Sequence, residues 1–261
     1  MKSLISKATL LFSVLIFHIS GIALAAVESG TVIEEQLETA YELHISGNEQ
    51  ASLTIYTDIL SNDDDNLEAL WNASILHSKK GYRATSDDVA ESEYEKALNL
   101  ARKAVELYPD SGHAYYALAV GIGRMSLLEG PANKVRASRD IKENIEKAIE
   151  RVPNFAPVWH LYGVWHSDIA NLNGAIKAAA TLFGGIPDAS NKKAEEYLSK
   201  AITLDSDNIL FRLDFAKHYR KVGQPEKARE LLEAILATEP QMKDDPIYIQ
   251  EAGEMLHEIG V

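Results

Sequence analysis

Apolar residues recur along most of this chain at the three- and four-residue spacing of an amphipathic helix. Four segments show this spacing and then end alike, in a proline or in a polar residue that replaces it. They are Glu95–Ser111, Lys142–Phe155, Ala194–Asn208 and Glu226–Pro240. Because proline lacks an amide hydrogen and disfavours helix in the residue before it, each ending predicts that a helix stops and a turn follows.

Each ending is followed by a second apolar helix with its own pattern. In the stretch WHLYGVWH, the fourth, seventh, eighth and eleventh positions of this helix are Trp159, Tyr162, Gly163 and His166. The eighth position is also small in the neighbouring copies, where it is Ala119 or Ala216. A small residue is needed there because the paired helix crosses closest at that point. Trp159 and His166 are therefore expected to pack between two helices.

The two helices together resemble the tetratricopeptide repeat, whose pattern runs from a Trp through Leu-Gly and a Tyr to an Ala, an aromatic residue and a closing Pro. WHLYGVWH matches that signature with two substitutions, and Leu213–Pro240 has the length of an uninterrupted unit. We count five units, at about 33–66, 67–111, 112–155, 156–208 and 209–240, and a capping helix at about 245–259. The resemblance implies an all-α fold, a right-handed α-solenoid that forms one domain over residues 26–261.

Three units are longer than the plain repeat at one point, the turn between their two helices. Nine residues separate Tyr219 from Ala228 in unit five, whereas the matching separations in units two, three and four are 20, 19 and 28. The added residues lie within 78–93, 123–140 and 167–193. Insertions on a common edge often form a binding surface. The alternative is that they lengthen the helices and bury their own apolar residues, such as Leu182 and Phe183.

The lengthened units resemble one family of repeat proteins. The stretches Leu161–Ala170, Thr181–Ser190 and Ala194–Asn208 are similar to the repeat domain of the regulator of microtubule dynamics family, and the similarity spans roughly Tyr94 to Pro240. That family has animal members linked to microtubules and many uncharacterised bacterial relatives. The resemblance implies the repeat fold and, as one alternative for function, a role in microtubule dynamics.

The N-terminus predicts export. Two lysines precede an apolar run, Ala8–Phe17, and the small residues that follow end at Ala25. This is the layout of a secretory signal peptide covering residues 1–25. The run is too short to span a bilayer. We therefore expect a periplasmic or secreted protein of bacterial type, with no stable membrane insertion after cleavage.

The composition excludes several kinds of binding and catalytic site. The chain has no cysteine, which excludes disulfides, thiolate zinc sites and cysteine nucleophiles. It has 39 acidic and 26 basic residues, a net charge of −13, and this disfavours binding to nucleic acid. His160 and His166 lie on different faces of one helix and cannot chelate one metal ion. We expect no enzyme, metal or cofactor, although an enzyme or metal site built by the insertions remains an alternative.

The function predicted is that of a protein-interaction scaffold. A partner segment of unknown identity would bind in the groove lined by the first helix of each unit, or along the inserted edge. The groove positions with candidate side chains are Trp71, Lys79, His113, Tyr116, Arg124, His160, Lys217, Arg220 and Lys221, with Asp168 beside them. The thirteenth position is basic in three of four units, a pattern that favours an acidic segment or a C-terminal carboxylate. Separate, solvated cations are the alternative.

Overall fold

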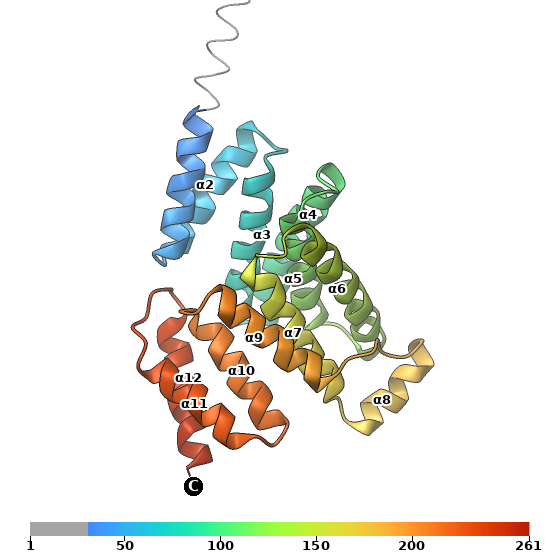
Figure 1. Cartoon of the computed structure of the whole chain (residues 1–261). Helices are drawn as coiled ribbons and strands as arrows, with labels where there is room; N and C mark the ends of the chain where they lie inside the picture. Colours follow the sequence, from blue (N-terminus) through green and yellow to red (C-terminus); the bar gives the residue numbers. More distant parts are fainter. Residues whose placement is uncertain (1–30, 261) are drawn as a thin grey trace, which may run out of the picture.

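The computed structural model describes residues 31–260, and the regular structure in that range is helical. The predicted signal peptide lies outside the described residues. After a helix over residues 31–45, the elements are α2 (Glu49–Asn62), α3 (Leu67–Tyr82), α4 (Asp87–Leu107), α5 (Gly112–Ser126), α6 (Pro131–Arg151), α7 (Ala156–Ala170), α8 (Gly174–Ala180), η1 (Thr181–Phe183), α9 (Asn191–Leu204), α10 (Ile209–Lys221), α11 (Pro225–Leu236) and α12 (Asp245–Ile259). They form a curved row of helix pairs (Figure 1), so the predicted all-α solenoid is confirmed.

Polar caps and prolines set where the helices begin and end. The Asn66 side chain accepts a hydrogen bond of 3.0 Å from the Ala69 amide at the start of α3, and Ser111 caps α5 in the same way. Such caps satisfy amide groups that have no partner within the helix. The helices α4 and α6 stop shortly before Pro109 and Pro153, as their sequence endings predict.

The small eighth position of each first helix is where the second helix crosses. A Cβ atom on Gly163 would lie 2.6 Å from Cγ of Leu198 and 2.9 Å from its backbone nitrogen. The helices α7 and α9 can therefore approach this closely only because position 163 has no side chain. In α3 the same position is Ser74, which is fully buried and donates a 2.8 Å hydrogen bond to the Ala97 carbonyl.

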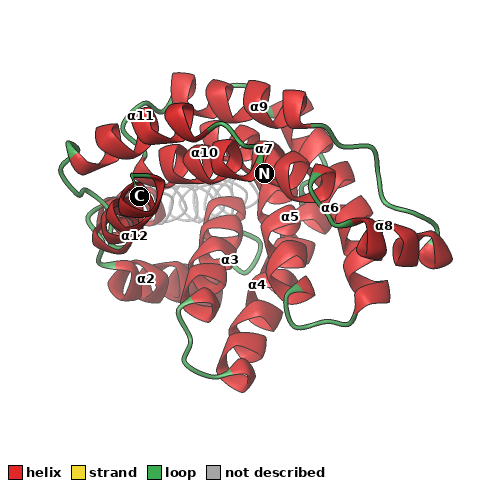
Figure 2. Ribbon diagram, turned by 90° about the horizontal axis from the view of Figure 1, so that it is seen from below, coloured by secondary structure: helices red, strands yellow, loops and turns green. Residues whose placement is uncertain are grey.

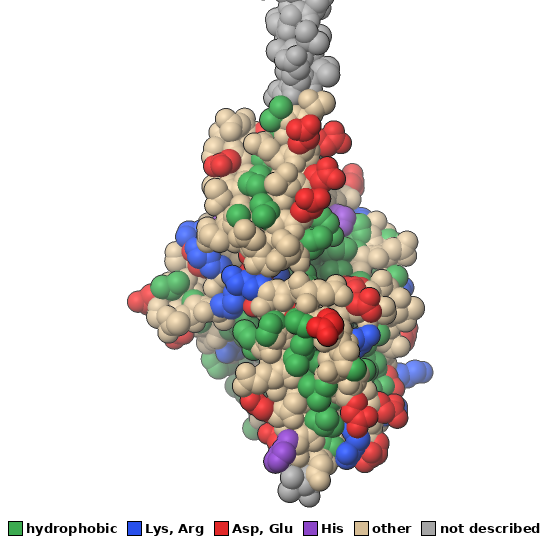
Figure 3. All heavy atoms as spheres, turned by 90° about the vertical axis from the view of Figure 1, so that its left-hand side faces the viewer, with side chains coloured by type: hydrophobic (Ala, Val, Ile, Leu, Met, Phe, Trp, Pro, Cys, Tyr) green, Lys and Arg blue, Asp and Glu red, His purple; other side chains and the backbone are tan. Residues whose placement is uncertain are grey.

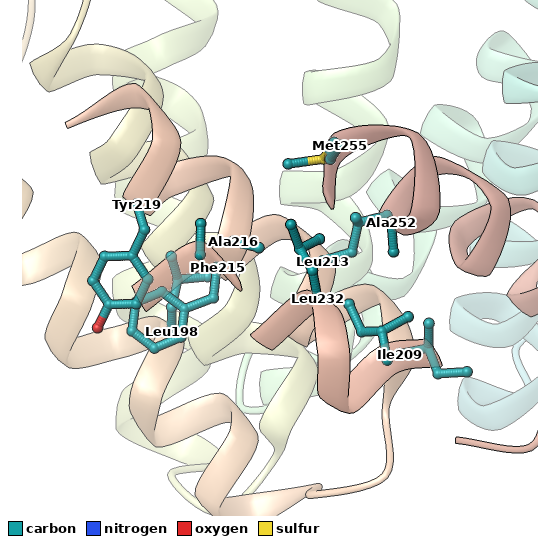
Figure 4. Close-up of a cluster of buried hydrophobic side chains, with 11 residues drawn as sticks. Leu198, Ile209, Leu213, Phe215, Ala216, Tyr219, Leu232, Ala252 and Met255 are labelled. Carbon is teal, nitrogen blue, oxygen red and sulfur yellow. The ribbon is translucent and has the colours of Figure 1, made fainter. Parts of the chain in front are cut away.

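One hydrophobic cluster ties the last unit to the C-terminal helix (Figure 4). Leu213 of α10 and Leu232 of α11 are fully buried in it. Ala252 and Met255 of α12 contribute to the same cluster and are also buried. A terminal repeat needs such a cover because its apolar side has no following unit to pack on.

The three insertions adopt two different structures. In units two and three they lengthen the second helix, because α4 and α6 have 21 residues each whereas α11 has 12. In unit four, α8 and η1 form a separate excursion that projects from the body (Figures 1 and 2). Leu182 there is 82% exposed and Phe183 is 44% exposed. The alternative in which the insertions bury their own apolar residues is therefore wrong for these two side chains.

The two ends of the solenoid meet. Figure 2, seen from below, shows α3, α5, α7 and α10 on the inner side of the row. Arg83, directly after α3, forms an ion pair with Glu49 of α2 and another, 2.8 Å long, with Asp244 before α12. Glu49 and Asp244 are both buried. Figure 3 looks onto this side, where Lys and Arg side chains lie between the upper and lower parts of the molecule.

Candidate functional site on the inner face

The predicted groove residues lie on α3, α5, α7 and α10, the helices of the inner face (Figure 2). The structure sorts most of them, with neighbours that the sequence did not single out, into two groups. The aromatic group is Trp71, His113, Tyr116 and Phe155. The charged group is His160, Asp214, Lys217 and Glu251.

The aromatic group joins α3 and α5 to the turn before α7. The rings of Trp71 and His113 are stacked, with centroids 5.0 Å apart and planes 18° apart. The Phe155 ring is nearly perpendicular to three rings, at centroid distances of 6.2 Å to Trp71, 4.8 Å to His113 and 5.1 Å to Tyr116. Edge-to-face and stacked pairs at these distances contribute stabilising free energy in addition to that from the apolar area that they bury. All four side chains remain partly exposed to solvent.

Burial keeps the aromatic group uncharged. It lowers the pKa of His113 below 6.5, so the neutral imidazole is favoured. It raises the pKa of Tyr116 to about 12, and nearby Arg124 only partly offsets this effect. The group therefore offers partly exposed aromatic rings and no ionised side chain of its own near neutral pH.

Phe155 was missed by the sequence analysis. It is the N-cap residue of α7 and directly precedes the first helix of unit four, so the repeat phase did not count it as a groove position. Its place in the closing turn, two residues after Pro153, was the available signal. A turn residue can reach the inner face only when the following unit is packed against the preceding one.

The cation of unit three has an aromatic partner. The Arg124 guanidinium lies over the ring of Tyr82, 4.3 Å from its centroid. Such contacts attract the cation to the negative face of the ring. Tyr82 ends α3 and is itself 57% exposed, so this pair stands at the open end of the two helices.

The side chains of the charged group pair with one another. His160 Nε2 lies 2.9 Å from Oδ2 of Asp214, and its ring stacks on Phe211 with centroids 4.4 Å apart. Lys217 Nζ lies 3.4 Å from Oδ1 of Asp214 and 3.0 Å from Oε1 of Glu251 on α12. Burial alone would raise the pKa of Asp214, but His160 and Lys217 together hold it below 3.8.

The other predicted cations of unit five are paired as well. Arg220 lies 2.8 Å from Glu258 of α12, and Lys221 lies 2.6 Å from Asp168 of α7. With Lys217 and Met255 they line an open pocket of about 290 Å³. The structure thus brings these cations together, but each faces a carboxylate. Two of these carboxylates, Glu251 and Glu258, come from α12, which the repeat phase did not include.

Lys79 belongs to the contact between the two ends of the chain. Its Nζ lies 2.8 Å from Oε1 of Glu49 and 3.3 Å from Nε2 of His44. Burial, reinforced by Lys79, lowers the pKa of His44 to about 4. Glu49 connects this lysine to Arg83, so Lys79 is engaged in closing the solenoid.

The stretch WHLYGVWH is packing, as predicted. His166 is fully buried, and burial together with nearby lysines lowers its pKa to about 4. Trp159 packs on Tyr197 of α9, with ring centroids 5.4 Å apart. Trp165 is buried too and donates a 3.0 Å hydrogen bond to the Ser138 carbonyl on α6. The stretch therefore contacts both the preceding helix and its own partner helix.

Neither a cluster of metal ligands nor a membrane-spanning helix is found among residues 31–260. Within residues 31–260, no three His, Cys, Asp or Glu side chains are grouped so that they could hold a metal ion. Over the same part of the chain, no helix combines the length and the hydrophobicity that crossing a bilayer requires.

Comparison with known proteins agrees with the repeat architecture and assigns the chain to one family. The family model for regulator of microtubule dynamics protein 1-3 matches residues 36–260, from the first described helix to the end of α12. The chain belongs to this family. Regulator of microtubule dynamics protein 1 of Bos taurus is 29% identical over 84% of this chain and 67% of its own length. Its Mus musculus counterpart is 28% identical over 89% of this chain and 76% of its own length.

A solved structure shows the same fold. A thermophilic TPR protein of Thermus thermophilus superimposes with a TM-score of 0.61, and the match covers 85% of this chain and 99% of that one. The two sequences are 19% identical, so the likeness concerns the fold alone. The family member described here is thus a tetratricopeptide-like solenoid, a fold typical of protein-interaction scaffolds.

Proposed function

We propose that this protein is a non-catalytic scaffold that binds a partner polypeptide on its inner face, and that the aromatic group anchors the partner. The observation that carries the proposal is the meeting of four partly exposed rings from α3, α5 and the turn before α7. Aromatic residues dominate the binding energy of many interfaces, because they bury a large area at little entropic cost.

The chemistry of the site favours an apolar or aromatic anchor in the partner. The aromatic group is uncharged near neutral pH, and Arg124 is drawn toward Tyr82. A proline-rich or aromatic segment can pack on such rings without leaving a charge unpaired. An acidic partner, in contrast, would have to displace carboxylates that already contact the cations of unit five.

Site-specific photo-crosslinking tests this proposal. A photoreactive phenylalanine analogue at Tyr116, in the chain produced in its own cells, should cross-link to a partner protein. The same analogue at Glu230, exposed on α11, is the matched control and should give no such product. Adding Phe155→Ala to the Tyr116 variant should remove the product while the protein stays folded.

The outcome distinguishes the faces of the molecule. Cross-links from position 221 together with none from position 116 would move the binding site to the charged end of the inner face. Cross-links that persist at full strength in the Phe155→Ala background would show that the aromatic group is not the anchor.

A second candidate function follows from the names of the relatives. Because regulator of microtubule dynamics protein 1 is similar over most of this chain, an effect on microtubules is proposed as the alternative. Purified chain added to polymerising tubulin tests it by turbidity. An unchanged polymerisation curve, and no co-sedimentation with the polymer, would rule it out.

Export is a separate proposal that rests on residues 1–25 alone. We propose cleavage after Ala25 and a periplasmic or secreted location, supported by the apolar run Ala8–Phe17 and the small residues behind it. Intact-mass measurement of the protein from its natural cells should find a chain that starts at Ala26. A mass that includes residues 1–25 would contradict cleavage.

A further inference from the structure

The excursion of unit four carries an exposed apolar tip. Ile176 on α8 is 47% exposed, Leu182 is 82% exposed and Phe183 is 44% exposed. Figure 1 shows α8 standing away from the row of repeats, with α9 leading back to it. Apolar side chains gathered on a projecting element mark an interaction surface more often than isolated exposed ones do.

The tip is held in a defined conformation. Arg139 on α6 donates hydrogen bonds to the carbonyls of Phe183, at 2.8 Å, and Gly185, at 2.5 Å. Gly184 and Gly185 have positive φ angles of 91° and 75°, a backbone that a glycine adopts without strain. The Gly185 amide also donates to the Ala180 carbonyl at 2.9 Å. The sequence thus builds a turn that already presents Leu182 outward, so little backbone entropy remains to be lost on binding.

The excursion itself carries no acidic residue, although the chain as a whole is acidic. No Asp or Glu lies between Asp168 and Asp188, although the chain has 39 such residues among 261. Lys134 and Arg136 are exposed on α6, the helix whose Arg139 contacts the tip, and Lys192 is exposed at the start of α9, directly after the excursion. Within the described part of the chain, none of these three cations forms a salt bridge, whereas the cations of the inner face in unit five all do.

From this combination we infer that the tip docks on the surface of an anionic lipid bilayer. Leu182 and Phe183 enter the boundary between headgroups and acyl chains, and the flanking cations contact the lipid phosphates. Peripheral membrane elements combine these two features, apolar residues for insertion and cations for attraction to anionic lipids. A partner protein or a second copy could cover the apolar tip, but the unpaired cations specifically favour an anionic surface.

A single label tests the proposal, because the chain has no cysteine. The full chain with Leu182→Cys is labelled with a fluorophore that brightens in apolar surroundings. It is then mixed with vesicles of phosphatidylcholine, with or without phosphatidylglycerol. We expect a several-fold rise in emission with the anionic vesicles only, and quenching by nitroxide-labelled lipid. The label reports on the tip itself, whatever residues 1–30 do.

The matched control is Leu236→Cys, since Leu236 is 45% exposed on α11 at the opposite end of the molecule (Figure 2). Its label should not respond to the vesicles. Three results would overturn the proposal. They are no response at position 182, an equal response at position 236, or a rise at position 182 without vesicles as the protein concentration increases, which would show contact with a second copy.

Removing the flanking cations tests the electrostatic part. Lys134→Ala with Lys192→Ala should weaken partition into anionic vesicles about 30-fold, since each cation near such a surface contributes about a fivefold factor. The control pair is Lys103→Ala with Lys227→Ala, two solvent-accessible lysines that already have carboxylate partners. Equal losses in the two pairs would contradict a surface specific to the tip.

Discussion

The two groups lie on the same inner face of the solenoid and yet differ in chemistry. The aromatic group is made of rings from units two and three and contains no ion pair. The charged group contains Lys217 and Asp214, and α12 adds Glu251 to it. A residue's position in the repeat therefore determines whether its side chain faces inward. The neighbouring elements determine whether that side chain is already paired or is free to bind.

The largest effect should come from breaking the aromatic group. Phe155→Ala removes the ring that touches Trp71, His113 and Tyr116 and should lower the free energy of unfolding by about 2–3 kcal/mol, somewhat less than for a fully buried phenylalanine. Urea unfolding followed by circular dichroism measures the loss. Phe183→Ala, at the exposed tip, is the control and should cost at most about 0.5 kcal/mol. Equal costs would mean that the group is not a packed unit.

A smaller effect is expected in the charged group. Asp214→Ala leaves His160 without its carboxylate and Lys217 with only one, and should cost about 1–2 kcal/mol because the site is half-buried. Thermal unfolding of the variant tests this. Asp168→Ala removes an exposed carboxylate that also pairs with a lysine and should cost much less. If the exposed carboxylate proved the costlier one, burial would not be what distinguishes the two sites.

The two groups should lose their contributions to stability over different ranges of acidic pH. The pKa of His113 is lowered by burial, so the unfolded chain binds the proton more readily and the stability from this residue falls as pH drops below about 6.5. The pKa of Asp214 is also lowered, by its cationic partners, so its contribution is present above about pH 4 and is lost as pH falls through the lowered value.

NMR titration of both side chains measures these midpoints, and Phe155→Ala sharpens the test. Exposing the His113 ring should move its midpoint back toward 6.5 and leave that of Asp214 unchanged. A His113 midpoint at or above 6.5 in the unaltered protein would show that the ring is not desolvated.

The smallest effect should come from the exposed pair in unit five. Lys221 and Asp168 are 39% and 59% exposed, and exposed ion pairs contribute little. Lys221→Ala should therefore change the free energy of unfolding by at most about 0.5 kcal/mol, and added salt should reduce even this difference. Differential scanning calorimetry at low and high salt is the measurement. A loss as large as that of Asp214→Ala would remove the distinction between buried and exposed pairs.

Much of the fold could be predicted because it is local. The helix spacing, the closing prolines and the small residue at Gly163 each reflect a requirement within one unit or between two adjacent helices. The candidate site was predicted in part. His113 and Tyr116 were assigned to the inner face from their phase alone, but nothing in that phase showed that Phe155 would join them.

The sequence by itself determined the repeats, their order and the side of each helix that faces inward, since these follow from residue spacing. Only the tertiary structure decided which side chains are engaged. Glu251 meets Lys217 because α12 folds back on α10, and Arg83 reaches Asp244 because the curvature of the stacked units brings the two ends together. Contacts between residues so far apart depend on the summed rotations of every unit between them. That sum cannot be predicted from any local pattern in the sequence.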